Sequence, residues 1–157
     1  ILNTEQKKSI ESIDLQDVTN HYFGFLAIDE NGEMRNSIII EKNTPLPASV
    51  TTSDFFTIKQ GQTSVKCTVT QSSVAEKDPN FVKIVWEGKL GNLPKGRPPG
   101  QSIEITFNYD SNQVMHCSFR DIASGEFIEV DLNEKDGLDK TSKVEETKKS
   151  IDEFLIE

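Results

Sequence analysis

The side chains that could act as nucleophiles, bases or metal ligands are few and scattered along this 157-residue sequence. The two histidines, His21 and His116, lie far apart, and neither belongs to a cluster with metal-ligand spacing. Cys67 and Cys117 lie in strand-like segments, where a reduced and buried thiol is expected. Cys67 also has no general base at a recognisable position. We therefore expect no catalytic residue, no metal ion and no cofactor in this part of the chain.

Acidic residues suggest two further kinds of chemistry, and both have simpler explanations. The segment 29–33, DENGE, has the composition of a calcium loop, but it lacks EF-hand spacing and is typical of a turn. A sandwich enzyme such as a glycosidase would need paired carboxylates on one concave face. Glu104 is expected on the outward face of its strand and Asp110 at a turn. His116 is likewise expected on an outward face, in contact with solvent.

Composition and charge exclude several classes of partner. The chain has 26 acidic and 17 basic residues, and its net charge of −9 disfavours nucleic acid, whose phosphates need clustered Lys and Arg. No apolar stretch approaches the roughly 18–20 residues that span a bilayer, and no signal-peptide pattern opens the sequence. Two cysteines do not make a disulfide framework. We expect a soluble cytoplasmic domain without a nucleic-acid or membrane partner.

Short apolar runs separated by turn signals extend from residue 23 to residue 132. Asn31-Gly32, between the runs 23–28 and 34–41, is a strong hairpin signal because both residues tolerate positive φ. Further runs follow at 50–58, 64–71, 81–86, 101–109, 114–119 and 126–132. The pattern predicts an all-β fold, a two-sheet antiparallel β-sandwich of about eight strands.

Alternation within these runs predicts which face of each strand is buried. In the run 64–71, Val65, Cys67 and Val69 share one face, so Thr68 and Thr70 are expected on the solvent face. Other runs alternate in the same way. One-sided burial of this kind is typical of an antiparallel sheet with one face in solvent.

Two runs are apolar on both faces and therefore differ from the rest. Phe55 and Phe56 point to opposite faces, and the run 23–28 is apolar throughout. Such strands are unusual in a small sandwich unless a loop, a helix or a ligand covers the second face. From the pattern alone, core packing is the simpler explanation.

The two ends of the chain differ from its middle. Residues 1–16 are polar with isolated Ile and Leu, as in a linker or tail. The S-x-x-E spacing that begins at Ser142 predicts one short C-terminal helix running to about Leu155. We expect a linker over 1–16, a sandwich domain over 17–137 and a helical segment over 138–157.

A series of short segments occurs along the chain in a distinctive order. They are DVT at 17–19, Gly24, NTPLP at 43–47, QTSV at 62–65, PPG at 98–100, IEITF at 103–107 and HCSFRD at 116–121. Their order resembles that of the substrate-binding domain of Hsp70 (DnaK-type) chaperones. The resemblance covers about residues 14–157, and the combination of NTPLP with IEITF is more specific than a single motif.

The resemblance implies a channel on the sandwich that binds extended, apolar segments of unfolded polypeptides. Main-chain hydrogen bonds would supply affinity that tolerates many sequences, and a central pocket would select a Leu-like side chain. By position, the pocket would be formed by Phe25, Ala27, Phe55, Val65, Cys67 and Ile103. Ile58, with Phe56 beside it, would form one side of an arch over the peptide, and Ile28 is the candidate for the other side.

The resemblance also implies partners outside this stretch of chain. A nucleotide-binding domain that holds ATP would precede it in the same chain and regulate peptide binding, and the segment 138–157 would begin a helical lid. This stretch would then bind peptide without being an enzyme. The apolar residues 154–156 could enter the channel of a second molecule, which would cause self-association.

Several departures from the family pattern support an alternative function. The first loop is about four residues longer than in the familiar bacterial member, the linker reads IDLQ at 13–16 instead of a run of leucines, and Phe25, Phe56 and Ile58 are bulky. Asn112, where the family has an aspartate, bears instead on coupling to an ATPase domain. The alternative is an Hsp70-like interaction or adaptor domain with an occluded channel that binds a folded partner. Binding of a short Leu-rich peptide would separate the two hypotheses, because an adaptor should not bind it.

Overall fold

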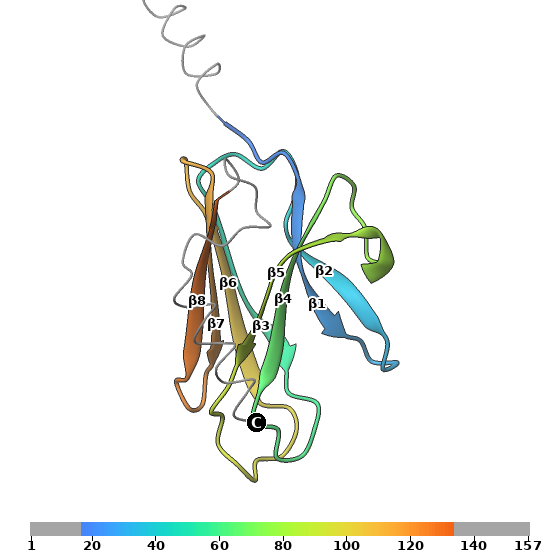
Figure 1. Cartoon of the computed structure of the whole chain (residues 1–157), viewed down its shortest axis with the longest axis vertical. Coiled ribbons are helices and arrows are strands. Elements are labelled where there is room, and N and C mark those ends of the chain that lie inside the picture. Colours follow the sequence, from blue (N-terminus) through green and yellow to red (C-terminus); the bar gives the residue numbers. More distant parts are fainter. Residues whose placement is uncertain (1–16, 134–157) are drawn as a thin grey trace, which may run out of the picture.

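A computed structural model describes residues 17–133, which form two antiparallel four-stranded sheets packed face to face (Figure 1). The first, sheet I, has the order β2-β1-β4-β5, with β1 Tyr22–Ile28, β2 Met34–Ile40, β4 Val65–Ser72 and β5 Lys83–Leu90. The second, sheet II, has the order β3-β6-β7-β8, with β3 Ala48–Phe56, β6 Ser102–Tyr109, β7 Val114–Asp121 and β8 Phe127–Asn133. The predicted all-β sandwich is confirmed.

One strand begins later than its apolar run predicts. Phe81 lies in a short 3-10 turn, Pro79–Phe81, whose first residues are held by the carboxylate of Asp78 accepting the N–H of Asn80 at 2.9 Å. The strand β5 therefore starts at Lys83 and continues to Leu90. No helix among residues 17–133 is long and apolar enough to cross a membrane.

Three of the predictions concern residues outside the described range. They are the linker over 1–16, the last residues of the predicted sandwich domain at 134–137, and the C-terminal helix within 138–157.

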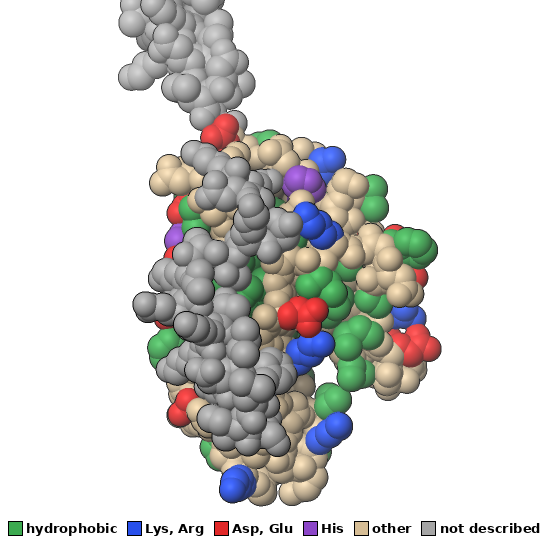
Figure 2. Space-filling view, in the orientation of Figure 1, with side chains coloured by type: hydrophobic (Ala, Val, Ile, Leu, Met, Phe, Trp, Pro, Cys, Tyr) green, Lys and Arg blue, Asp and Glu red, His purple; other side chains and the backbone are tan. Residues whose placement is uncertain are grey.

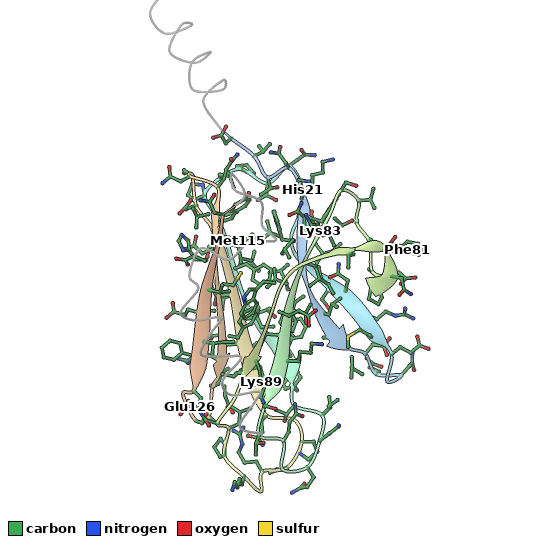
Figure 3. All side chains as sticks on the ribbon, in the orientation of Figure 1. His21, Phe81, Lys83, Lys89, Met115 and Glu126 are labelled. Atoms are coloured by element: carbon green, nitrogen blue, oxygen red, sulfur yellow. The ribbon has the colours of Figure 1, made fainter. Side chains whose placement is uncertain are left out.

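The core lies between the two sheets and is rich in aromatic side chains. Trp86 of β5 stacks on Phe119 of β7 with ring centroids 5.7 Å apart and an interplanar angle of 6°, and Phe119 also lies 5.5 Å from the ring of Phe25. Met115 is among the fully buried side chains between the sheets (Figure 3). Apolar side chains thus connect sheet II with strand β1 of sheet I.

The two cysteines, Cys67 on β4 and Cys117 on β7, lie in this core as free, buried thiols. Burial raises the pKa of Cys67 to about 12. The thiol form is therefore the stable one near neutral pH, as the sequence predicts.

The prediction that Thr68 and Thr70 face solvent is wrong. Their side chains are buried, and Thr70 is only 1% exposed. The segment 73–82 between β4 and β5 folds back over β2, where the side-chain amide of Asn36 donates to the main-chain oxygen of Glu76 at 2.8 Å. The Thr70 hydroxyl donates to the other end of the same amide. The loop that follows β4 therefore returns over β2 and covers the outer face of sheet I at Thr70.

Candidate functional site

Sheet I opens between β1 and β4. The ladder between these strands pairs residues 22–25 with residues 72–69 and ends at the pair Phe25 and Val69. Strand β1 stays paired with β2 as far as Ile28, and the β1–β2 hairpin leans away from β4 beyond the end of the ladder (Figure 1). Residues 26–28 and 65–68 therefore have main-chain edges that face the opening, where the β1–β4 ladder does not continue.

A groove of about 1100 Å³ lies at this opening. It is bordered by the β1–β2 hairpin, strand β3, the connection from β3 to β4, the start of β4, and strand β6 of sheet II. Apolar side chains gather around the notch between the β1–β2 hairpin and the rest of the molecule (Figure 2). The groove is the place where the sandwich offers apolar surface and unpaired strand edges together.

All but one of the side chains predicted to bind peptide line this groove. They are Phe25, Ala27, Ile28, Phe55, Phe56, Ile58, Val65 and Ile103. The remaining one, Cys67, has no exposed surface and lies in the core behind the groove. Cys67 therefore affects the groove only through the residues that pack in front of it.

The floor of the groove is aromatic and aliphatic. The rings of Phe25 and Phe55 meet edge to face with centroids 5.3 Å apart. Phe25 is 3% exposed and Ile103 is 2% exposed, so these side chains form the base of the groove. This geometry explains the runs that are apolar on both faces: on one face Phe25 and Phe55 form the floor of the groove, and on the other Ile28 and Phe56 stand exposed at its rims.

Large apolar side chains stand exposed on both rims of the groove. On one side are Ile28 and Met34 at the end of the β1–β2 hairpin, and on the other are Phe56 and Ile58. Each of these four side chains has at least two fifths of its surface exposed. Sequence reasoning missed Met34, although the Asn31-Gly32 hairpin signal could have found it, since the register places Met34 opposite Ile28.

The segment 29–33 forms the tip of the hairpin beside the groove. The carboxylate of Asp29 accepts the N–H groups of Asn31 at 2.9 Å and Glu33 at 3.0 Å, and it lies 3.3 Å from Arg35 Nε. The hydrogen bond from the Glu33 N–H is the main cause that lowers the pKa of Asp29. The Asp29 carboxylate thus organises the turn that the sequence predicts here.

A second polar cluster lies outside the groove, on the outer face of sheet II. His116 is outward-facing as predicted, but its ring nitrogens lie 2.8 Å from Asp110 Oδ2 and 2.7 Å from Asp131 Oδ1. Glu104 lies 3.9 Å from Arg120 on the same sheet. Among residues 17–133 no group of three or more His, Cys, Asp or Glu side chains could hold a metal ion.

Comparison with known proteins connects this geometry with one family. The family model described as "Hsp70 protein" matches residues 1–156. The chain is 31% identical over 113 residues to the chaperone protein DnaK of Anaplasma marginale (strain St. Maries). It is 29% identical over 102 residues to the heat shock 70-related protein 1, mitochondrial, of Leishmania major.

These alignments cover most of this chain but a small part of either relative. They span 72% and 65% of the chain respectively, and 16% of the length of each relative. The family model, in contrast, matches nearly every residue of the chain. The chain belongs to the Hsp70 family.

Proposed function

We propose that this β-sandwich is a chaperone module that binds extended, apolar segments of unfolded polypeptides in the groove. The observation that carries the proposal is the opening of sheet I beside an apolar floor, where the ladder between β1 and β4 ends at Phe25 and Val69. An extended peptide can hydrogen-bond to strand edges of this kind while its side chains enter pockets between them. Family membership supports a chaperone role.

Two parts of the groove would contribute to peptide binding in different ways, its strand edges through main-chain hydrogen bonds and its floor through apolar contact. Main-chain groups of residues 26–28 and 65–68 would pair with the peptide backbone, which is the same for every sequence. The floor formed by Phe25, Phe55 and Ile103 would bury one apolar side chain, at about 25 cal/mol per Å² of apolar surface removed from water. We therefore expect broad recognition with a preference for an apolar residue at one position.

The longer protein is also part of the proposal. The chain spans 16% of the length of each curated relative, and the described residues form a β-sandwich rather than an ATPase domain. We propose that an ATPase domain in the same longer protein holds ATP and regulates the groove. The cytoplasmic location stays a prediction, and one of the relatives carries the name of a mitochondrial protein.

Titration of a labelled, short Leu-rich peptide, followed by fluorescence anisotropy, tests the proposal. Val65→Phe would place a large ring in the groove. Val74→Phe is the matched control, because Val74 is 58% exposed and lies outside the groove. We expect saturable binding that is weakened at least about tenfold by Val65→Phe, roughly 1.4 kcal/mol, and preserved by Val74→Phe.

Two results would contradict the proposal. One is an equal loss of binding in both variants, which would show that the groove is not the site. The other is the absence of binding by folded, monomeric protein, which would favour the adaptor alternative and a folded partner.

A further inference from the structure

The two walls of the groove are held in different ways. The hairpin wall, residues 28–34, is held by bonds within itself, such as Asp29 N–H to the Glu33 oxygen at 2.8 Å and Gly32 N–H to the Asp29 oxygen at 3.0 Å. The loop wall, residues 57–64, connects β3 with β4 and belongs to neither strand. Its shape must therefore be maintained by other contacts.

Main-chain bonds fasten the base of the loop wall to the connection between β5 and β6. Thr57 N–H donates to the Gln101 oxygen at 2.9 Å, and Gly61 N–H donates to the Arg97 oxygen at 2.7 Å. The Thr57 hydroxyl, a side chain of the loop wall, also accepts the N–H of Gln101 at 3.0 Å. These bonds keep the base of the wall against the sandwich, and the rim residues Ile58 and Lys59 follow it.

Beyond Thr57, the side chain of Gln62 bonds the rim segment directly, next to a main-chain bond from the Gln62 N–H to the Lys59 oxygen at 3.3 Å. Its Oε1 accepts the N–H groups of Ile58 at 2.9 Å and Lys59 at 3.1 Å. Its Nε2 donates to the main-chain oxygen of Ser64 at 2.8 Å. One amide thus joins the segment that leaves β3 to the residue that precedes Val65 at the start of β4.

Few side chains can make this set of contacts. The position requires an acceptor for two N–H groups and a donor for one carbonyl oxygen, and a primary amide supplies both. An ionised carboxylate would accept from Ile58 and Lys59 but would place a negative charge against the Ser64 oxygen. An apolar side chain would leave all three main-chain groups without this partner.

We infer that Gln62 is a positioning residue of the peptide groove, whose side-chain amide holds the Ile58 rim in its binding geometry before a peptide arrives. The inference rests on the proposed function. Ile58 is 51% exposed at the rim, and the hydrogen bonds to its own N–H and to that of Lys59 determine where its side chain stands. A rim ordered in advance lowers the entropic cost of binding, and such differences appear mainly in the dissociation rate.

The first test compares Gln62→Ala with Gln71→Ala. Gln71 lies on β4 and outside the groove, so its variant is a matched control. We expect Gln62→Ala to release a labelled, short Leu-rich peptide about tenfold faster in stopped-flow anisotropy. We also expect faster amide hydrogen exchange at Ile58 and Lys59 in the unbound variant, while Gln71→Ala behaves as the wild type.

The second test uses Gln62→Glu and pH. A protonated glutamate offers a carbonyl acceptor and an O–H donor, as the amide does, whereas the ionised form has no donor. We expect fast peptide release near pH 7 and a return toward the wild-type rate as pH falls through about 4.3, the ordinary pKa of Glu. Gln71→Glu should not show this recovery, and circular dichroism checks that each variant is folded. If Gln62→Glu released peptide faster only because the whole domain was less stable, lowering the pH would not restore the wild-type rate of release.

The outcomes separate the inference from the proposed function. Wild-type rates of peptide release in both Gln62 variants, or unchanged exchange at Ile58 and Lys59 in Gln62→Ala, would overturn the role of Gln62 and leave the groove as a peptide site. A wild-type protein that binds no peptide would overturn the proposed function, and the role of Gln62 with it.

Discussion

The two sheets of this sandwich differ in how completely their strands are paired. In sheet II, β7 pairs without interruption with both neighbours, through seven residue pairs on each side. In sheet I, the ladder between β1 and β4 has four pairs, and both outer ladders contain a register shift, at Phe23/Gly24 and at Val69/Thr70. Sheet II has one register shift as well, between Thr52 and Phe55 in the β3–β6 ladder. The groove lies in the sheet whose central ladder, between β1 and β4, is short.

The comparison shows how a small domain can provide an open strand edge and stay folded. Sheet II supplies a continuous layer whose inward side chains, such as Ile105 and Phe119, are fully buried. Ile103 and Ile105 of this sheet also reach the groove. Sheet I can therefore leave part of two strands unpaired, because Phe55 and Ile103 of sheet II form the floor below them together with Phe25 of sheet I.

Removal of a core ring from sheet II should have the largest effect on stability. Phe119 is fully buried and contacts Trp86, Phe25 and Phe107. We expect Phe119→Ala to lower the free energy of unfolding by about 3–5 kcal/mol, measured by urea denaturation, because it leaves a cavity at the centre of the core.

The matched change at the groove rim is Phe56→Ala, where the side chain is 54% exposed. Its expected effect on the free energy of unfolding is about 0.5 kcal/mol or less. Similar losses in the two variants would show that the groove rim contributes to stability as much as the core does, and the distinction between core and rim would fail.

A smaller loss of stability is expected at Gly24, where the β1–β4 ladder is still intact. A Cβ atom here would lie 2.6 Å from Asn36 Oδ1 and 2.7 Å from the main-chain oxygen of Ser37. We expect Gly24→Ala to lower the free energy of unfolding by about 1–3 kcal/mol, because β1 must move away from β2. A change below about 0.5 kcal/mol would show that β1 shifts freely even where it is paired.

The smallest expected effect is the pH dependence of the free energy of unfolding that comes from the polar cluster of His116, Asp110 and Asp131 on sheet II. The hydrogen bond to Asp110, together with that to Asp131, raises the pKa of His116 despite its partial burial. A raised pKa in the folded state means that the stabilisation is complete below about pH 6.5, the ordinary pKa of His, and is lost as pH rises through the higher folded value.

The magnitude should be about 1 kcal/mol or less, because the His116 side chain is 41% exposed and solvent screens the pair. Urea denaturation between pH 5 and pH 9 would measure it, and His116→Gln should remove that part of the pH dependence. An identical pH profile in the variant would show that the cluster does not connect β7 with β8 and the turn at Asp110.

Local patterns predicted the elements of this fold well. The Asn31-Gly32 signal predicted the β1–β2 hairpin, and the alternation over residues 103–107 predicted the inward face of β6, because both depend on neighbouring residues. Burial of Thr70 was not predictable in this way, since the segment that covers it follows β4 and returns over β2.

The groove was predictable to a lesser extent. The resemblance to a family placed eight side chains that line it but also included Cys67, which shares a strand face with Val65 and lies deeper in the core. The alternation of side chains along a strand indicates which face of the sheet a residue is on. It does not indicate how far the residue lies from the end of the β1–β4 ladder, where the groove opens. The role of Gln62 depends on three main-chain groups that a loop brings to one amide.

The sequence by itself determined the strands, their turns and most inward faces, because alternation and turn formation are properties of adjacent residues. Only the tertiary structure decided where the β1–β4 ladder ends, which loop covers sheet I, and which side chain holds the rim of the groove. The first two features depend on contacts between segments that are distant in the chain. The third depends on the conformation of a loop that brings Ile58, Lys59 and Ser64 to one amide, which strand alternation and turn signals do not predict.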